Sequence, residues 1–211
     1  MEVLLIRHGQ TEPLCDTTPT KEAAGLDGGW PDGSLTALGQ RQASALQPRM
    51  AAFAPQRVLC SDLARARCTA ELACAGLDVR IEQMPALREI HMGRMHRQNW
   101  EALSREDPAF CEAWHAHRED LPYPGGESGD DTAARAWPVL ETLAAQNVER
   151  AAIFCHGGTI RVLLCRALGL PPQRRFALGP FENTSVSTLR HGPHGWSLYA
   201  SNDYAHLQGL Q

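Results

Sequence analysis

Lysine is nearly absent from this 211-residue chain, because Lys21 is the only one and arginine carries almost all of the fixed positive charge. Chemistry that depends on a Schiff-base lysine or on a phosphate-loop lysine therefore has essentially no candidate. The net charge is −4 at neutral pH, and the sequence lacks the basic stripe that follows a nucleic-acid backbone. We expect a small-molecule partner and no nucleic acid.

Long apolar runs are also missing. Met1–Arg7 is too short and reaches a charge too early to be a signal peptide, and no later run approaches the length of a membrane span. The seven cysteines form an odd set without a C-x-x-C pair, which favours reduced and mostly buried thiols. We therefore expect a cytoplasmic protein without a membrane partner, whose oligomeric state the sequence leaves unknown.

Metal-binding motifs are absent as well. One stretch of the chain contains several histidines, namely His91, His96, His115 and His117. They do not form the H-E-x-x-H pattern, and no pair of cysteines completes a zinc set. We expect neither a bound metal nor another cofactor.

The composition is otherwise that of a globular protein, with 43% apolar and 21% charged residues. Short apolar runs predict strands over Val3–Ile6, Arg57–Cys60, Val79–Ile81 and Ala151–Cys155, with two more near Thr184–Leu189 and Trp196–Ala200. Helical patterns cover residues 34–52, 63–75, 127–146 and 159–168. Pro138 should kink or split the third of these helices. Strands that alternate with helices predict an α/β fold with a mainly parallel sheet.

Capping chemistry predicts where two of the helices begin. Ser34 or Thr36 suits the N-cap of the first helix. Ser61 and Asp62 suit the N-cap of the second, which places Arg65 in its first turn.

Two histidines stand at matching places in the predicted sheet. His8 and His156 each follow a buried strand and each precede a glycine, which lets the backbone approach a ligand closely. Ligands of parallel sheets bind at the carboxyl ends of the strands, so we expect both imidazoles to line one pocket. The amides of Gly9, Gly157 and Gly158, with the N-terminus of the following helix, favour an anion there.

Arg7 and Arg65 add fixed positive charge to this pocket. Further short motifs occur in register with them over nearly the whole chain. The full set is Arg7–Thr11, Leu35–Thr36 with Gly39 and Gln42–Ala43, Ser61–Ala66 with Thr69–Ala70, Leu87–Ile90 with Gly93, Gly125–Ser128 and His156–Thr159. In residue type and order, these motifs resemble the histidine phosphatase superfamily, also called phosphoglycerate-mutase-like.

The resemblance implies a three-layer α/β/α fold with a mainly parallel central sheet. It implies a single domain over residues 1–211, with a small lid inserted at roughly residues 90–123. It also implies an enzyme of the histidine acid-type phosphatase class, a phosphoric monoester hydrolase that acts on a small phosphorylated metabolite. Inorganic phosphate is then the expected product.

The resemblance further assigns roles to individual residues. It implies that His8 becomes phosphorylated and that Glu89 donates a proton to the leaving group. Arg7, Arg65 and His156 then surround the transferred phosphoryl group. The expected substrate-binding residues are Gln10, Thr11, Gly157 and Gly158.

Elementary chemistry agrees with these roles. A phosphomonoester carries about −1.5 to −2 charges at neutral pH and repels an anionic nucleophile, whereas a neutral imidazole avoids that repulsion. Arg7 and Arg65 should lower the pKa of His8 and keep its ring neutral. An anionic phosphate beside Glu89 favours the protonated carboxyl that a proton donor needs.

Two departures from the family pattern bear on the substrate. Mutases of the family usually carry asparagine six residues after the nucleophile, where this chain has Leu14, and a longer insertion before Gly-Gly-Glu-Ser. The phosphatase branch is therefore favoured. That branch commonly follows its glutamate with Gly-x-x-Glu-Gly, whereas this chain has Gly93-Arg94-Met95 and then His96-Arg97. We therefore expect unusual lid chemistry.

Several alternatives stay open. One group of lid residues either contacts a second anionic group of the substrate or forms a solvated face, namely His91, Arg94, His96, Arg97 and Arg118. The chain is alternatively a cofactor-dependent, phosphoglycerate-mutase-type isomerase, or a phospho-ligand binding module without catalysis. The last alternative predicts loss of at least one member of the proposed catalytic set, and none is lost. The sequence does not determine the substrate or its pathway.

Overall fold

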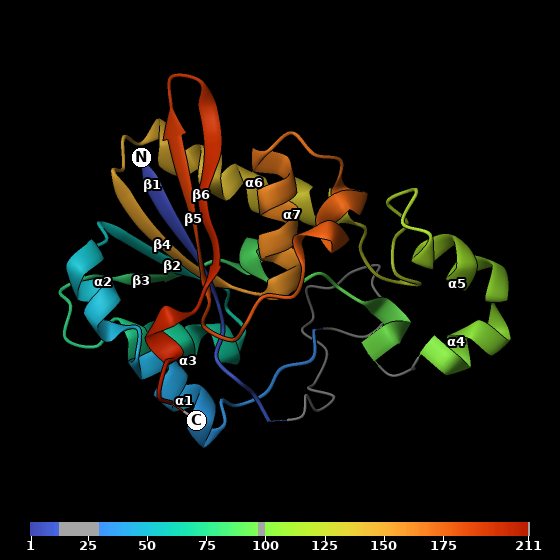
Figure 1. The fold of residues 1–211 in the computed structure, drawn as a ribbon, viewed down its shortest axis with the longest axis horizontal. Helices are drawn as coiled ribbons and strands as arrows, with labels where there is room; N and C mark the ends of the chain where they lie inside the picture. The colour runs from blue at the N-terminus through green and yellow to red at the C-terminus, as the bar shows by residue number, and fades with distance from the viewer. Residues whose placement is uncertain (13–29, 97–99, 211) are drawn as a thin grey trace.

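The computed structural model describes residues 1–12, 30–96 and 100–210, which form a six-stranded sheet in the order β3-β2-β4-β1-β5-β6 (Figure 1). The strands are β1 (Glu2–Arg7), β2 (Arg57–Cys60), β3 (Ile81–Gln83), β4 (Arg150–Cys155), β5 (Val186–Gly192) and β6 (Gly195–Asp203). The strands from β1 to β4 are parallel to one another, whereas β5 is antiparallel to β1 and to β6. The predicted mainly parallel sheet is confirmed.

Helices cover both faces of the sheet. They are α1 (Ala37–Ser44), α2 (Gln47–Phe53), α3 (Ala64–Ala73), α4 (Trp100–Glu106), α5 (Pro108–His115), α6 (Gly129–Ala145) and α7 (Gly157–Ala167). Side chains of a strand alternate between its faces, so Val3 and Leu5 of β1 pack with α6 and α7. Leu4 and Ile6 pack on the opposite face with α2 and α3. The three-layer α/β/α fold is therefore confirmed.

The single helix predicted over residues 34–52 is wrong, because the structure has two helices there. Thr36 caps α1 as predicted, and its Oγ1 accepts a hydrogen bond from the Gly39 amide at 2.9 Å. Helix α1 ends at Ser44, and Pro48 lies in the first turn of α2. Proline has no N–H to bond to the carbonyl four residues earlier, but it is tolerated in a first turn. Pro48 therefore marks the break.

Pro138 does not split α6, which runs unbroken from Gly129 to Ala145. The buried face of α6 contributes several aliphatic side chains to the core, among them Val139, Leu140 and Leu143. Each such burial stabilises the fold by about 1.5–3 kcal/mol, and together they outweigh a proline penalty of roughly 3 kcal/mol. The helix begins later than predicted, because Ser128 and Asp131 form a capping box.

The starts of β3 and α7 are among the other boundaries that differ from the predictions. Strand β3 begins at Ile81 instead of Val79, because its pairing with Val58 of β2 starts there. Helix α7 begins at Gly157 instead of Thr159, with His156 at its N-cap. The two glycines after His156 therefore lie in the first turn of a helix.

Helices α4 and α5 belong to the segment predicted as a lid, and they project away from the sheet in Figure 1. They have an apolar cluster of their own, which includes Leu103, Cys111, Trp114 and Tyr123. The lid role of this segment stays a prediction. Short 3₁₀ segments complete the described elements, namely η1 (Pro85–Leu87), η2 (Gly93–His96), η3 (Pro172–Leu178) and η4 (Ala205–Leu207).

The described cysteines are all free thiols, and most of them are buried. Cys15 lies outside the described residues. Within the described ranges, no helix is both long enough and apolar enough to cross a membrane.

Candidate active site

His8 and His156 lie at the carboxyl ends of two neighbouring strands of the sheet. Strands β1 and β4 are adjacent and parallel, with Arg7 paired to Cys155, so the residues that follow both strands emerge side by side. The two imidazole centroids lie 5.2 Å apart. His8 is 8% exposed and His156 is fully buried. The predicted convergence of the two rings is confirmed.

The ring of His8 is held by its own backbone neighbour. Its Nδ1 lies 2.8 Å from the Gly9 carbonyl oxygen. If Nδ1 carries the proton and donates to that carbonyl, Nε2 keeps the free lone pair of the neutral imidazole. The His8 carbonyl in turn accepts from the Asn183 side chain at 3.0 Å and the Thr184 amide at 3.3 Å. The backbone under the ring is therefore held by the turn that precedes β5 as well as by β1.

Gly9 is required because the loop after β1 packs closely against the first turn of α1. A Cβ at this position would lie 2.6 Å from the Gly39 carbonyl oxygen, a contact that neither backbone can relieve. The Gly9 amide donates to Thr69 Oγ1 at 3.0 Å. This amide, which we expected to face a bound anion, is therefore already paired within the protein.

Burial lowers the pKa of His8 to about 3, with the Arg65 guanidinium as the next cause and Arg7 adding to it. The bond to the Gly9 carbonyl opposes this shift. Arg7 and Arg65 were the only causes predicted from the sequence, and the structure shows that desolvation is larger. The pKa of His156 is also lowered, first by burial and then by Arg65. Both rings are neutral at pH 7.

The neutral burial of His8 should make the free energy of unfolding depend on pH. The ring binds a proton below about pH 6.5 in the unfolded chain but only near pH 3 in the folded one. Its contribution to stability is therefore present above pH 6.5 and is lost progressively as the pH falls toward 3. We expect His8→Asn to remove about 2.5 kcal/mol of the stability difference between pH 7 and pH 4.5. Urea unfolding of both proteins at the two pH values measures it, and equal losses would contradict a neutral buried ring.

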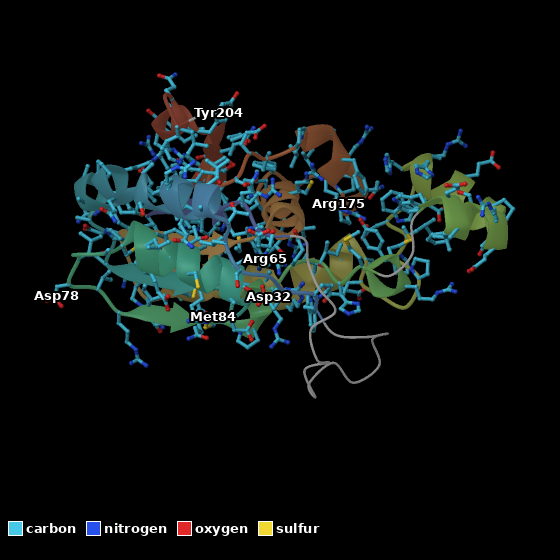
Figure 2. The ribbon with its side chains drawn as sticks, turned by 90° about the horizontal axis from the view of Figure 1, so that it is seen from below. Asp32, Arg65, Asp78, Met84, Arg175 and Tyr204 are labelled. Carbon is cyan, nitrogen blue, oxygen red and sulfur yellow. The ribbon has the colours of Figure 1, made fainter. Side chains whose placement is uncertain are left out.

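Arg65 is held in the first turn of α3, as predicted, but by a residue that the sequence did not identify. Its Nη1 donates to Asp32 Oδ1 at 3.0 Å and to the Pro31 carbonyl at 2.8 Å. The Asp32 carboxylate also accepts from the Ala64 amide at 2.5 Å, so it caps the helix. Figure 2 shows Asp32 and Arg65 side by side. Asp32 thus orients the guanidinium.

The predicted cap from Ser61 and Asp62 is therefore wrong. The N-cap position is Leu63, and no side chain of the predicted pair caps the helix from there. Asp62 instead forms an ion pair with Arg88, with oxygen–nitrogen distances of 2.5 and 2.9 Å. The carboxylate of Asp32 arrives from a distant loop, which local capping rules do not anticipate.

Glu89 lies at the N-terminus of α7. Its carboxylate accepts from the Gly158 amide at 3.0 Å, the Thr159 amide at 2.9 Å and the Ile90 amide at 2.9 Å. A negative side chain is stabilised by the exposed amides of a helix N-terminus. Gly158 is required here, because a Cβ would lie 2.6 Å from Glu89 Oε1. The Gly158 amide was predicted to bind substrate, but it binds Glu89.

Four buried nitrogen atoms of this site have no hydrogen-bond partner among the described residues. They are Nε of Arg7, Nε of Arg65 and both ring nitrogens of His156. Buried polar atoms are rarely left unpaired, and each unpaired one costs about 1–3 kcal/mol. Arg7 is otherwise anchored through Nη1 to the Phe181 carbonyl. The three residues predicted to surround a phosphoryl group thus share an unmet demand for hydrogen bonds.

The remaining predicted residues have other partners. The Gln10 amide donates to Gln42 Oε1 at 2.9 Å, and its side chain accepts from Thr36 Oγ1 at 2.8 Å. Thr11 forms an isolated β-bridge with Leu35. These contacts tie the loop after His8 to the start of α1, and substrate contact by Gln10, Thr11 and Gly157 stays a prediction.

The lid residues are only partly described. His91 is buried, and Arg94 is about half exposed and pairs with Glu106 at 3.7 Å. The side chain of His96, and all of Leu14 and Arg97, lie outside the described residues. Among the side chains that the structure describes, no group of three or more His, Cys, Asp or Glu is arranged to hold a metal ion.

Sequence reasoning missed the roles of three residues that shape the site. Asp32 orients Arg65, whereas Trp30 and Arg135 donate to the Glu89 carbonyl at 2.6 and 2.9 Å. None of them stands next to a predicted catalytic residue in the sequence. Only their tertiary contacts reveal them.

Comparisons with known proteins agree with this geometry. A family model described as histidine phosphatase superfamily (branch 1) matches residues 3–204. The probable phosphoglycerate mutase GpmB of Erwinia tasmaniensis is 31% identical over 216 residues, which covers 99% of this chain and 95% of that protein. The metal-independent phosphoserine phosphatase of Arabidopsis thaliana is 30% identical over 213 residues, with 99% and 84% covered. The solved mycobacterial glucosyl-3-phosphoglycerate phosphatase in complex with inorganic phosphate has a TM-score of 0.78 at 27% identity, with 97% and 98% covered.

Proposed function

The chain belongs to branch 1 of the histidine phosphatase superfamily, and from that premise we propose that it hydrolyses a small phosphorylated metabolite through a phosphohistidine on His8. Its relatives are named as phosphatases and as mutases, which supports an enzyme of one of these two kinds. The complex of one neighbour with inorganic phosphate supports phosphate as the product.

The observation that carries the proposal is the set of unpaired buried nitrogens on Arg7, Arg65 and His156. In phosphoryl transfer, charge spreads over three equatorial oxygens, and catalysis depends mainly on donors placed around them. The two guanidinium groups and an imidazole N–H supply such donors close to His8. The oxygens of a phosphoryl group would accept hydrogen bonds from these unpaired nitrogens.

In the first step, Nε2 of His8 attacks phosphorus while the bond from phosphorus to the leaving oxygen breaks. The lowered pKa of His8 keeps the lone pair available, because the ring is neutral at working pH. Glu89 gives a proton to the departing oxygen, so the product is a neutral alcohol. The helix terminus that binds the Glu89 carboxylate fixes the position of this donor.

In the second step, Glu89 accepts a proton from a water molecule as that water attacks the phosphohistidine. The phosphorus–nitrogen bond breaks, inorganic phosphate leaves, and His8 returns to its neutral form. Glu89 regains its proton, so the cycle closes without a metal or a redox partner.

A single-turnover experiment tests this sequence of steps. Substrate labelled in its phosphoryl group should give an acid-labile labelled protein that decays as labelled inorganic phosphate appears at the same rate. When 3-phosphoglycerate is also present, we expect more than nine-tenths of the label to appear as inorganic phosphate. This threshold separates hydrolysis from transfer to the phosphorylated acid. A protein that never becomes labelled would overturn the proposal.

The mutase alternative keeps the same intermediate but changes its fate. It is favoured by the names of several relatives, which are probable phosphoglycerate mutases. In the experiment above, a mutase would transfer its label to a phosphorylated acid faster than to water. Transfer in excess of hydrolysis would therefore replace the phosphatase assignment.

A further inference from the structure

One arginine of α6 forms hydrogen bonds to the main chain around Glu89. Arg135 Nη1 donates to the carbonyls of Ala86 and Arg88, both at 2.8 Å, and Nη2 donates to the Glu89 carbonyl at 2.9 Å. Three carbonyls within four residues thus bind a single guanidinium group. A planar, rigid fork of donors fixes the direction of each bond, which a lysine cannot do.

The other donors of Arg135 are satisfied by Glu127. Nε donates to Glu127 Oε1 at 2.7 Å, and Nη2 donates to Glu127 Oε2 at 2.8 Å. A guanidinium group has five N–H donors, and all five of these are used. Glu127 is itself buried and accepts from the His91 amide at 2.8 Å, so the chain is held on the far side of Glu89 as well.

Trp30 adds a second donor to the same carbonyl. Its indole Nε1 lies 2.6 Å from the Glu89 oxygen. The guanidinium groups of Arg88 and Arg135 lie 4.9 and 6.0 Å from the centre of its ring, within the range of cation–π attraction. The main-chain carbonyl of Glu89 therefore accepts from two donors, Trp30 and Arg135. The side-chain carboxylate of Glu89 is bound separately, by amides of α7.

We propose that Arg135 is a positioning residue for the proton donor, because it holds the Glu89 backbone so that the carboxyl group reaches the leaving oxygen. This inference rests on the proposed role of Glu89. It goes beyond that role in assigning the precision of proton delivery to a residue of α6 that does not touch the phosphoryl site. Arg135→Lys keeps the positive charge beside Glu127 but removes the fork that binds the three carbonyls.

Leaving groups of different basicity separate this role from a merely structural one. A basic alkoxide needs a proton as it departs, whereas p-nitrophenolate is stable enough to leave without one. In Arg135→Lys we expect kcat/KM for an alkyl phosphate such as glycerol phosphate to fall about ten- to a hundredfold. For p-nitrophenyl phosphate it should fall less than about threefold, because His8, Arg7, Arg65 and His156 are unaffected. Competitive inhibition by inorganic phosphate should change less than about twofold for the same reason.

Two further variants make the test decisive. Glu89→Gln should also lower kcat/KM more for the alkyl phosphate than for p-nitrophenyl phosphate, and by a larger factor than Arg135→Lys does. In the double variant, Arg135→Lys should cause little further loss of kcat/KM for the alkyl phosphate. Arg57→Lys is the matched control, because Arg57 makes a similar fork with Glu82 at 2.7 and 2.9 Å at the sheet edge. We expect Arg57→Lys to leave kcat/KM for both substrates unchanged.

The outcomes distinguish the two hypotheses. An Arg135→Lys protein that loses activity equally on both substrates, or loses none, would overturn the positioning role while Glu89→Gln still shows the split. A Glu89→Gln protein without any split would instead overturn the proton-donor role on which the inference rests. A weakened inhibition by phosphate in Arg135→Lys would show that the whole site had changed, and it would also contradict the positioning role.

Discussion

Asparagine in place of His8 should abolish turnover of p-nitrophenyl phosphate, with a fall in kcat of at least about a thousandfold. Asparagine has no nucleophilic nitrogen, so neither a phosphorylated residue nor its hydrolysis is possible. We therefore expect acid-labile labelling from labelled substrate to disappear together with turnover. Steady-state kinetics and a labelling assay on the same preparation measure both effects.

The control for this variant is His191→Asn. The His191 amide donates to the Met1 carbonyl, at the end of β1 farthest from His8, so the substitution tests only the cost of changing a histidine near this strand. It should leave kcat within about twofold. Turnover that persists in His8→Asn, with an unchanged fold by circular dichroism, would eliminate His8 as the nucleophile.

Loss of a donor around the phosphoryl group should have the second-largest effect. Arg65→Lys should lower kcat for p-nitrophenyl phosphate about a hundred- to a thousandfold, as for other preorganised donors. Lysine keeps a charge beside Asp32 and so avoids leaving that mostly buried carboxylate unpaired. It has no counterpart of the Arg65 Nε atom, which is buried and has no partner within the described residues.

His156→Phe tests independently the effect of losing a donor around the phosphoryl group. The ring nitrogens of His156 make no hydrogen bond within the described chain, so replacing them with carbon removes the proposed donor to substrate without breaking a bond of the folded protein. We expect a fall in kcat of similar size, with little change in the thermal midpoint. Arg49→Lys is the control, because Arg49 pairs with Asp203 at a partly exposed site. A drop below threefold in both Arg65→Lys and His156→Phe would refute the proposed ring of donors.

Local sequence rules suffice for the strands of the sheet and for the two histidines that follow them. Buried strands that end in histidine and glycine are encoded by short runs of residues, and the parallel pairing of β1 and β4 then brings His8 and His156 together. Local rules failed where burial or a distant partner competes with them. The core-facing residues of α6 keep it continuous through Pro138, and Asp32 replaces the predicted cap of α3.

The sequence by itself determined the sheet, the two strand-end histidines and the family, because each follows from patterns a few residues long that recur in a fixed order. Only the tertiary structure decided how Arg65 and Glu89 are held. Asp32 reaches Arg65 across 33 residues of chain, and Arg135 reaches the Glu89 carbonyl across 46. The energy of such contacts depends on distances between elements after packing, and no local pattern in the sequence records those distances.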